Sequence, residues 1–253
     1  MNRRVSCVSF ALCLAAIVLP AAASADTVKI GSTLGHAANP NGELCAPCVG
    51  IQRAQAGGNS PLRLVSPATG VVTQWAVRTS DPGAIYNLRI LRPINNSSYT
   101  GVGTSPNAVV PPLTIDSVLI NNVSLPIKQG DAIGVAAGPA GHDLPSWPDN
   151  VAGDVVGYSL GNFADGSSSG TITDIPGHEL LIQATVSFCN VPNVHKQKKV
   201  NAKTALTNAD CGVKVKKKET HKKKFRGKVL KQKKAPGATA APGTVVAIVI
   251  GQK

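Results

Sequence analysis

Hydrophobic and polar side chains alternate in several short segments between residues 26 and 188. Tyr86, Leu88 and Ile90 are separated by single polar residues, and residues 180–188 carry an apolar side chain at every second position. A period of two turns one set of side chains toward a core, so these segments are predicted to form half-buried β-strands. Runs rich in β-branched residues predict further strands at residues 71–78, 113–120, 133–137 and 154–158.

Residues with strong turn preferences separate the predicted strands. They are Gly, Pro, Asn, Asp and Ser, and no segment of residues 26–188 shows convincing helical periodicity. Several short antiparallel strands bury a core only when one sheet packs on another. We therefore predict an all-β sandwich, of the jelly-roll or immunoglobulin-like kind, with turns at residues 81–83, 95–98, 121–122, 129–131 and 165–166.

The hydrophobic pattern changes after residue 188. Within residues 198–209, Ala202, Ala205, Leu206 and Ala209 recur at helical spacing, which predicts one amphipathic helix. The sequence therefore predicts a small α+β module, one helix on a sheet, with strands at residues 213–215, 229–232 and 244–250.

The charge distribution divides the chain at the same position. Residues 26–188 contain seven Lys and Arg against eleven Asp and Glu, a net charge of −4. Residues 189–253 contain seventeen against two, a net charge of +15. Such an abrupt change marks units with different roles, so we expect a sandwich domain at residues 26–188 and a basic module at residues 189–253.

The first 25 residues have the pattern of a cleavable signal peptide. Arg3 and Arg4 precede an apolar run at residues 5–20, and Ala23-Ser24-Ala25 matches the small residues that signal peptidase recognises. This run is shorter than the roughly 20 residues that a membrane-spanning helix needs. We therefore expect cleavage at residues 1–25, secretion of the mature protein to the extracellular space or cell wall, and no integral membrane segment afterwards.

A set of spaced motifs runs through residues 189–253. They comprise V-P-N-V at residues 191–194, A-x-x-A-L at residues 202–206, G-x-V-x-x-Q at residues 227–232, and P-G-T before a β-branched run at residues 242–250. In this order the motifs resemble the PASTA domain, the penicillin-binding-protein and serine/threonine-kinase associated module. The resemblance implies a helix on a three-stranded sheet, an extracellular location, an association with peptidoglycan or its fragments, and no catalytic residue.

Four cysteines remain once the expected signal is removed. An even number in an oxidising compartment favours two disulfides. Cys189 precedes the first motif and Cys211 follows the predicted helix, which returns the chain toward its start, so we expect these two to pair. Pairing of either with Cys45 or Cys48 is the alternative. Cys45 and Cys48 form a C-x-x-C, which we interpret as a structural disulfide because no predicted helix follows it as in thioredoxin-like sites.

This PASTA-like module has a higher density of lysine than the commonest family pattern. So many cations create a positive potential that attracts polyanions by counterion release, although a solvated, merely solubilising face is the alternative. Outside a cell we expect peptidoglycan or an anionic wall polymer as the partner. Nucleic acid is not expected, because Phe225 is the module's single aromatic residue for base stacking. The candidate polyanion-binding residues are Lys214, Lys216, Lys217, Lys218, Lys222, Lys223, Lys224 and Arg226.

Residues 157–161 match the G-x-S-x-G motif of α/β-hydrolases. Ser159 is followed by Asp165 or Asp174 and then by His178, the order of that catalytic triad. The motif functions where a strand turns into a helix, whereas residues 162–170 are rich in loop-forming residues. We therefore expect no catalytic residue, no cofactor and no metal site, and keep a secreted hydrolase with its site on the sandwich loops as an alternative.

Carbohydrate binding by the sandwich is the other alternative. Trp75 lies within a predicted strand, where a core position is expected, and Trp147 lies between two prolines in a predicted loop, where its ring is free to stack on a sugar. The leading hypothesis is a secreted, non-enzymatic cell-envelope protein. Its basic module binds the wall, and the sequence does not indicate the ligand of its sandwich.

Overall fold

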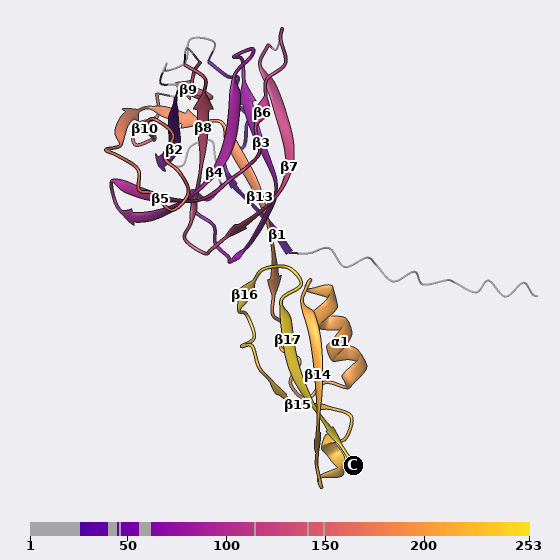
Figure 1. Cartoon of the computed structure of the whole chain (residues 1–253). Coiled ribbons are helices and arrows are strands. Elements are labelled where there is room, and N and C mark those ends of the chain that lie inside the picture. The colour runs from indigo at the N-terminus through magenta and orange to yellow at the C-terminus, as the bar shows by residue number, and fades with distance from the viewer. Residues whose placement is uncertain are drawn as a thin grey trace, which may run out of the picture.

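The computed structural model describes residues 26–39, 45, 47–55, 62–113, 115–140, 142–148 and 150–253. The chain forms mostly β-strands, with a small C-terminal region that contains one α-helix (Figure 1). The expected signal peptide, residues 1–25, lies outside the described residues. Among the residues described, no helix combines the length and apolar character needed to cross a membrane.

Two antiparallel sheets make up the larger part of the structure. The first has the order β1-β13-β3-β7, and the second has the order β11-β10-β2-β8-β4-β5, with β6 beside β4 and a separate pair formed by β9 and β12. The strands are β1 (Asp26–Gly31), β2 (Cys48–Ala54), β3 (Gly70–Thr79), β4 (Ile85–Asn95), β5 (Ser98–Thr104), β6 (Ala108–Val109), β7 (Ser117–Ile127), β8 (Ala132–Gly138), β9 (Ser146–Pro148), β10 (Val155–Leu160), β11 (Thr173–Pro176), β12 (His178–Leu180) and β13 (Ile182–Asn190).

The main hydrophobic core lies between these two sheets. Trp75 of β3 and Val186 of β13 come from the first sheet, and Tyr86, Leu88 and Val135 of β4 and β8 come from the second. All five side chains are buried. The alternation in the sequence therefore serves sheet-on-sheet packing, which confirms the predicted all-β sandwich.

Strand β7 differs from its predicted bounds. The sequence predicts a strand at residues 113–120 that ends in a turn at Asn121 and Asn122, but β7 runs through both asparagines. Asn121 pairs with Trp75 and Asn122 with Gln74, beside a shift in the β3–β7 register. The predicted turn at residues 121–122 is therefore wrong, because the ladder continues through both asparagines and a β-bulge in β7, with Val123 and Ser124 opposite Thr73, takes up the irregularity.

Strand β13 leaves the sandwich and begins the C-terminal module (Figure 1). Cys189 and Asn190, at the end of β13, pair with the short strand β16. The three-stranded sheet beyond has the order β14-β17-β15, with β14 parallel and β15 antiparallel to β17. The module contains the predicted helix and the three predicted strands. Its elements are α1 (Lys199–Asn208), β14 (Gly212–Glu219), the short 3-10 helix η1 (Lys223–Phe225), β15 (Val229–Gln232), β16 (Thr239–Ala240) and β17 (Val245–Gln252).

A second hydrophobic cluster fills the space between α1 and this sheet. Ala202 and Leu206 of the helix are fully buried and share the cluster with Val246 and Ile248 of β17. The same cluster contains Cys189, one residue beyond the change in charge and composition. The compositional boundary therefore falls inside β13, a strand that contributes to both cores.

Two cysteine pairs lie at disulfide distance. The Cα atoms of Cys189 and Cys211 are 5.1 Å apart, and those of Cys45 and Cys48 are 5.5 Å apart. Cys189 lies at the end of β13 and Cys211 immediately precedes β14, so this pair joins the two ends of the segment that contains α1. The helix brings the two backbones together, as the sequence-based argument for this pairing requires.

We expect the Cys189→Ser/Cys211→Ser double variant to lower the free energy of unfolding by about 3 kcal/mol. The disulfide joins residues 22 positions apart, and without it the unfolded chain regains the conformational entropy that the closed loop had removed. Thermal unfolding of residues 26–253 under oxidising conditions measures the change. Cys45→Ser/Cys48→Ser is the control, since it opens a loop with a separation of only 3 and should cost less. A peptide map that links Cys189 to Cys45 or Cys48 would contradict the pairing.

The carboxylate of Asp116 connects β3 to the segment that follows β1. Arg78 donates from Nε to Asp116 Oδ1 at 2.8 Å and from Nη2 to Oδ2 at 2.6 Å, and the amide of Ala38 donates to Oδ1 at 2.8 Å. These hydrogen bonds, first those from Arg78, lower the pKa of Asp116. The ionised form of this carboxylate is therefore the one that stabilises the fold.

We expect Asp116→Asn to lower stability at neutral pH by no more than about 1 kcal/mol, because the ion pair is partly exposed. The depressed pKa means that this stabilisation is complete above the ordinary Asp pKa of about 3.9 and is lost as the pH falls through the folded-state value. The difference between variant and parent in thermal unfolding should therefore shrink in acid. Asp26→Asn, at an exposed position, is the control; a difference that is independent of pH would contradict the assignment.

Candidate polyanion-binding surface

The β14-β17-β15 sheet has one face covered by α1 and one open face. Side chains of β17 alternate between them: Val246, Ile248 and Ile250 are buried against the helix, whereas Ala247 and Val249 are only half-buried. A short sheet with a single helix can bury only one of its faces. The residues opposite α1 are therefore available to solvent and to ligands.

Three of the predicted polyanion-binding lysines lie on this open face. Lys214 pairs with Ala247, Lys216 with Val249, and Lys218 with Gly251 in the β14–β17 ladder. Paired residues of neighbouring strands point to the same side of a sheet. All three lysines are exposed, so they form a row along one edge of the open face.

Strand β15 adds lysines on the other side of β17 that the sequence did not predict as binding residues. Lys231 pairs with Val249, and the amide of Lys233 donates to Ala247 O at 2.9 Å. Gln232, between them, turns inward, so the two lysines continue the alternation on the open face. We call the five residues Lys214, Lys216, Lys218, Lys231 and Lys233, with Ala247 and Val249 between them, the lysine face.

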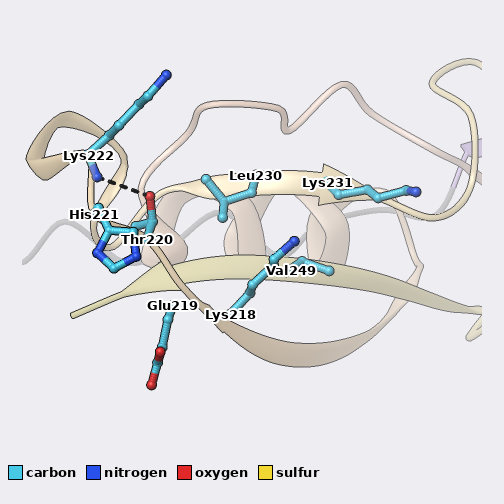
Figure 2. A pocket seen from close by; sticks show the side chains of 8 residues that line it. All are labelled: Lys218, Glu219, Thr220, His221, Lys222, Leu230, Lys231 and Val249. Carbon is cyan, nitrogen blue, oxygen red and sulfur yellow. Dashed lines mark hydrogen bonds between the residues drawn. The ribbon is translucent and has the colours of Figure 1, made fainter.

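A shallow hollow of about 530 Å³ lies at one end of the lysine face. Figure 2 shows Lys218, Leu230 and Val249 near its centre, with Lys222 and His221 on the loop at one side. Glu219 also lines the hollow, and its side chain points away from Lys218 and Leu230 (Figure 2). Lysines and aliphatic side chains make up most of the lining.

The remaining predicted residues lie on other surfaces of the module. Lys217 and Arg226 line a separate hollow of about 450 Å³, together with Lys199 and Lys253. Three predicted lysines follow β14, in and just before η1: Lys222, Lys223 and Lys224. The eight candidates thus do not form one site. The structure brings Lys214, Lys216 and Lys218 together on the lysine face, with Lys222 at its border.

The charges of the module are not neutralised within the described structure. The ion pairs found among the described residues all join side chains between His36 and Glu179. The module contains two acidic residues, Asp210 and Glu219, and neither belongs to any of these pairs. A cluster of uncompensated cations raises the local potential and attracts polyanions.

The candidate hydrolase residues have other partners. Ser159 is buried in β10, and Nδ1 of His178 lies 3.0 Å from Pro176 O. Asp165 pairs with Arg89 and Asp174 with Arg53. The structure therefore does not join Ser159, an aspartate and His178 into the hydrogen-bonded chain that a catalytic triad requires.

The two tryptophans occupy different environments. Trp75 lies in the sandwich core, as expected. Trp147 lies in β9 rather than in a loop, is half-buried beside Leu181, and stacks on His36 with ring centroids 5.8 Å apart. One ring face is thus already occupied, which corrects the expectation of a free ring that could stack on a sugar.

Comparison with protein families assigns the C-terminal module. Residues 190–252 match the PASTA domain. The match confirms the resemblance of the spaced motifs and places a single PASTA domain at the C-terminal end of the chain. PASTA domains are binding modules rather than catalytic ones. The match to this family therefore indicates a module with a function related to the cell wall. Comparisons with curated proteins and with solved structures found no match.

The motifs of the PASTA domain have identifiable structural roles. Gln232, which ends the G-x-V-x-x-Q motif, accepts from Val194 N at 3.1 Å and donates to Pro192 O at 3.0 Å. It thereby ties the opening V-P-N-V segment to β15. Two Pro-Gly pairs, at residues 236–237 and 242–243, lie between strands of the module. Gly237 and Gly243 have φ values of 79° and 73°, a region that favours glycine, so each turns the chain between strands.

We expect Gln232→Ala to destabilise the PASTA domain by about 1 to 3 kcal/mol, because it leaves a partly buried amide and carbonyl without partners. Denaturant unfolding of residues 26–253 measures the loss. Gln197→Ala is the matched control, since the Gln197 side chain donates only one exposed hydrogen bond, to Asn193 O. Equal losses in the two variants would contradict the assigned role of Gln232.

Proposed function

We propose that this protein is exported and acts as a non-enzymatic cell-envelope protein whose PASTA domain binds peptidoglycan or anionic wall polymers. The observation that carries the proposal is the lysine face, a set of exposed cations that no described acidic residue pairs with. It lies on a domain whose family indicates a cell-wall-related function. Long-range attraction to a wall polyanion then needs no deep pocket.

Export is part of the same proposal. The signal-peptide pattern of residues 1–25 directs the chain out of the cytoplasm, and the two cysteine pairs suit an oxidising compartment. Peptidoglycan and its attached polymers are the abundant polyanions there. Nucleic acid, the other common partner of basic modules, is not part of the proposed function.

We infer that the protein consists of a sandwich domain at residues 26–188 and a wall-binding domain at residues 189–253. The backbone of β13 joins them without a flexible linker, and Thr69 N donates to Thr239 Oγ1 at 3.3 Å across the junction. A wall-bound PASTA domain would therefore hold the sandwich close to the polymer in a defined orientation. The sandwich is then the part that presents its loops to further partners.

We expect insoluble peptidoglycan to retain residues 26–253 at low salt and to release them as salt rises. The Debye length falls from about 10 Å at 0.1 M to about 3 Å at 1 M, so exposed lysines lose most of their attraction over this range. A sedimentation assay measures retention. Lys216→Gln/Lys231→Gln should weaken it, whereas the matched control Lys29→Gln/Lys128→Gln, in the sandwich, should not.

Two outcomes would contradict parts of this proposal. Absence of retention at physiological salt on peptidoglycan that keeps its attached anionic polymers would refute wall binding. Retention that persists unchanged at 1 M salt would refute the electrostatic mechanism and indicate a specific pocket for a wall fragment instead.

A further inference from the structure

The lysine face has a regular spacing set by the sheet itself. Residues two apart on a strand lie about 6.7 Å apart, and strands on either side of a central strand lie about 9.6 Å apart. Lys214, Lys216 and Lys218 therefore form a row along β14, while Lys231 and Lys233 form a shorter row beyond β17. Between the rows runs an uncharged strip made by Ala247 and Val249.

We propose that the lysine face binds a linear phosphodiester polymer with a short polyol repeat, which lies along β17 between the two rows of lysines. This inference rests on the function proposed above and specifies its ligand class. It distinguishes a phosphate-bearing wall polymer from peptidoglycan itself.

The spacing of charges carries the choice of polymer. In a glycerol phosphate chain about six bonds separate successive phosphorus atoms, and bonds of about 1.5 Å in a zigzag span roughly 7 Å. This repeat matches the rise between Lys214, Lys216 and Lys218. The carboxylates of peptidoglycan lie on stem peptides one disaccharide apart, which is a longer and less regular spacing. The spacing of the lysines along β14 therefore favours a polymer that carries one charge on every short repeat.

The side chains of the lysine face are suited to a phosphate ligand. Lysine ammonium groups act as compact point charges that bind phosphate without the paired geometry of arginine and carboxylate. The five charged residues of the lysine face are all lysines. Their flexible stems can close over a chain that lies on the central strip.

The central strip fits an uncharged polyol backbone. Ala247 and Val249 are half-buried and small, and the described residues place no aromatic ring or acidic side chain between the rows. Glu219, the acidic residue next to the row on β14, points away from it (Figure 2). The hollow beside Lys218, with Lys222 at its edge, extends the positive surface beyond the end of β14.

The test is titration of residues 26–253 with a synthetic glycerol phosphate oligomer by isothermal calorimetry at several salt concentrations. We expect Lys214→Gln/Lys216→Gln/Lys218→Gln to lower affinity on the order of tenfold and to reduce the salt dependence, because phosphate contacts are lost. The matched control is Lys198→Gln/Lys199→Gln/Lys203→Gln. It removes the same charge at exposed positions in or next to α1, which covers the opposite face of the sheet. Its affinity should stay within about twofold of the parent.

Equal losses in the two triple variants would overturn the inference, since affinity would then follow net charge alone. Circular dichroism of both variants verifies folding, and competition on the parent protein provides a second measurement that requires no variant. Poly-L-glutamate at equal charge concentration should displace the oligomer poorly; equal displacement would overturn the preference for phosphate.

Binding to the wall itself separates this inference from the proposed function. Retention on peptidoglycan stripped of phosphate polymers, together with no affinity for the oligomer, would overturn the inference and leave wall binding intact. Failure of both would overturn both. Oligomer binding without retention on stripped peptidoglycan supports the inference and narrows the wall ligand to the phosphate polymer.

Discussion

The packing of α1 on one face of the β14-β17-β15 sheet determines the chemistry of the other face. Ala202 and Leu206 pack with Val246 and Ile248 in the hydrophobic cluster that forms the core of the module. Among the described residues no second layer covers the opposite face, so this face must tolerate water. Lysines meet that requirement along both outer strands. Because only one helix packs on the sheet, the domain is small and its uncovered face carries charged residues.

The shared strand β13 extends this constraint to the rest of the chain. Its apolar side chains, such as Val186, complete the sandwich core, and Cys189 at its end belongs to the core of the PASTA domain. The sandwich and the PASTA domain, which have net charges of opposite sign, are thus both attached to β13. Acidic residues of the sandwich form ion pairs with arginines and histidines of the same domain, for example Asp116 with Arg78. The positive potential of the PASTA domain remains available to an external ligand.

The sandwich shows where period-two alternation is informative and where it is not. Residues 85–88 of β4 and 182–186 of β13 alternate between buried and partly exposed positions, and their sequences predicted strands there. β2 was missed because it is buried on both faces: Cys48 lies in the main core, whereas Val49 and Ile51 pack beneath Phe163 on the outer side. A strand covered by a loop has no polar face to alternate with. The turn expected at Asn121 and Asn122 failed because ladder pairing outweighed a local preference.

The sequence by itself determined the charge boundary, the helix, the motifs of the PASTA domain and the excess of lysine, because these are local patterns or sums along the chain. It also predicted three lysines of the lysine face, since Lys214, Lys216 and Lys218 alternate within one strand. Only the tertiary structure added Lys231 and Lys233, because their place opposite Val249 and Ala247 depends on the register of β15 against β17. Packing between segments distant in sequence sets that register, and local patterns do not encode it.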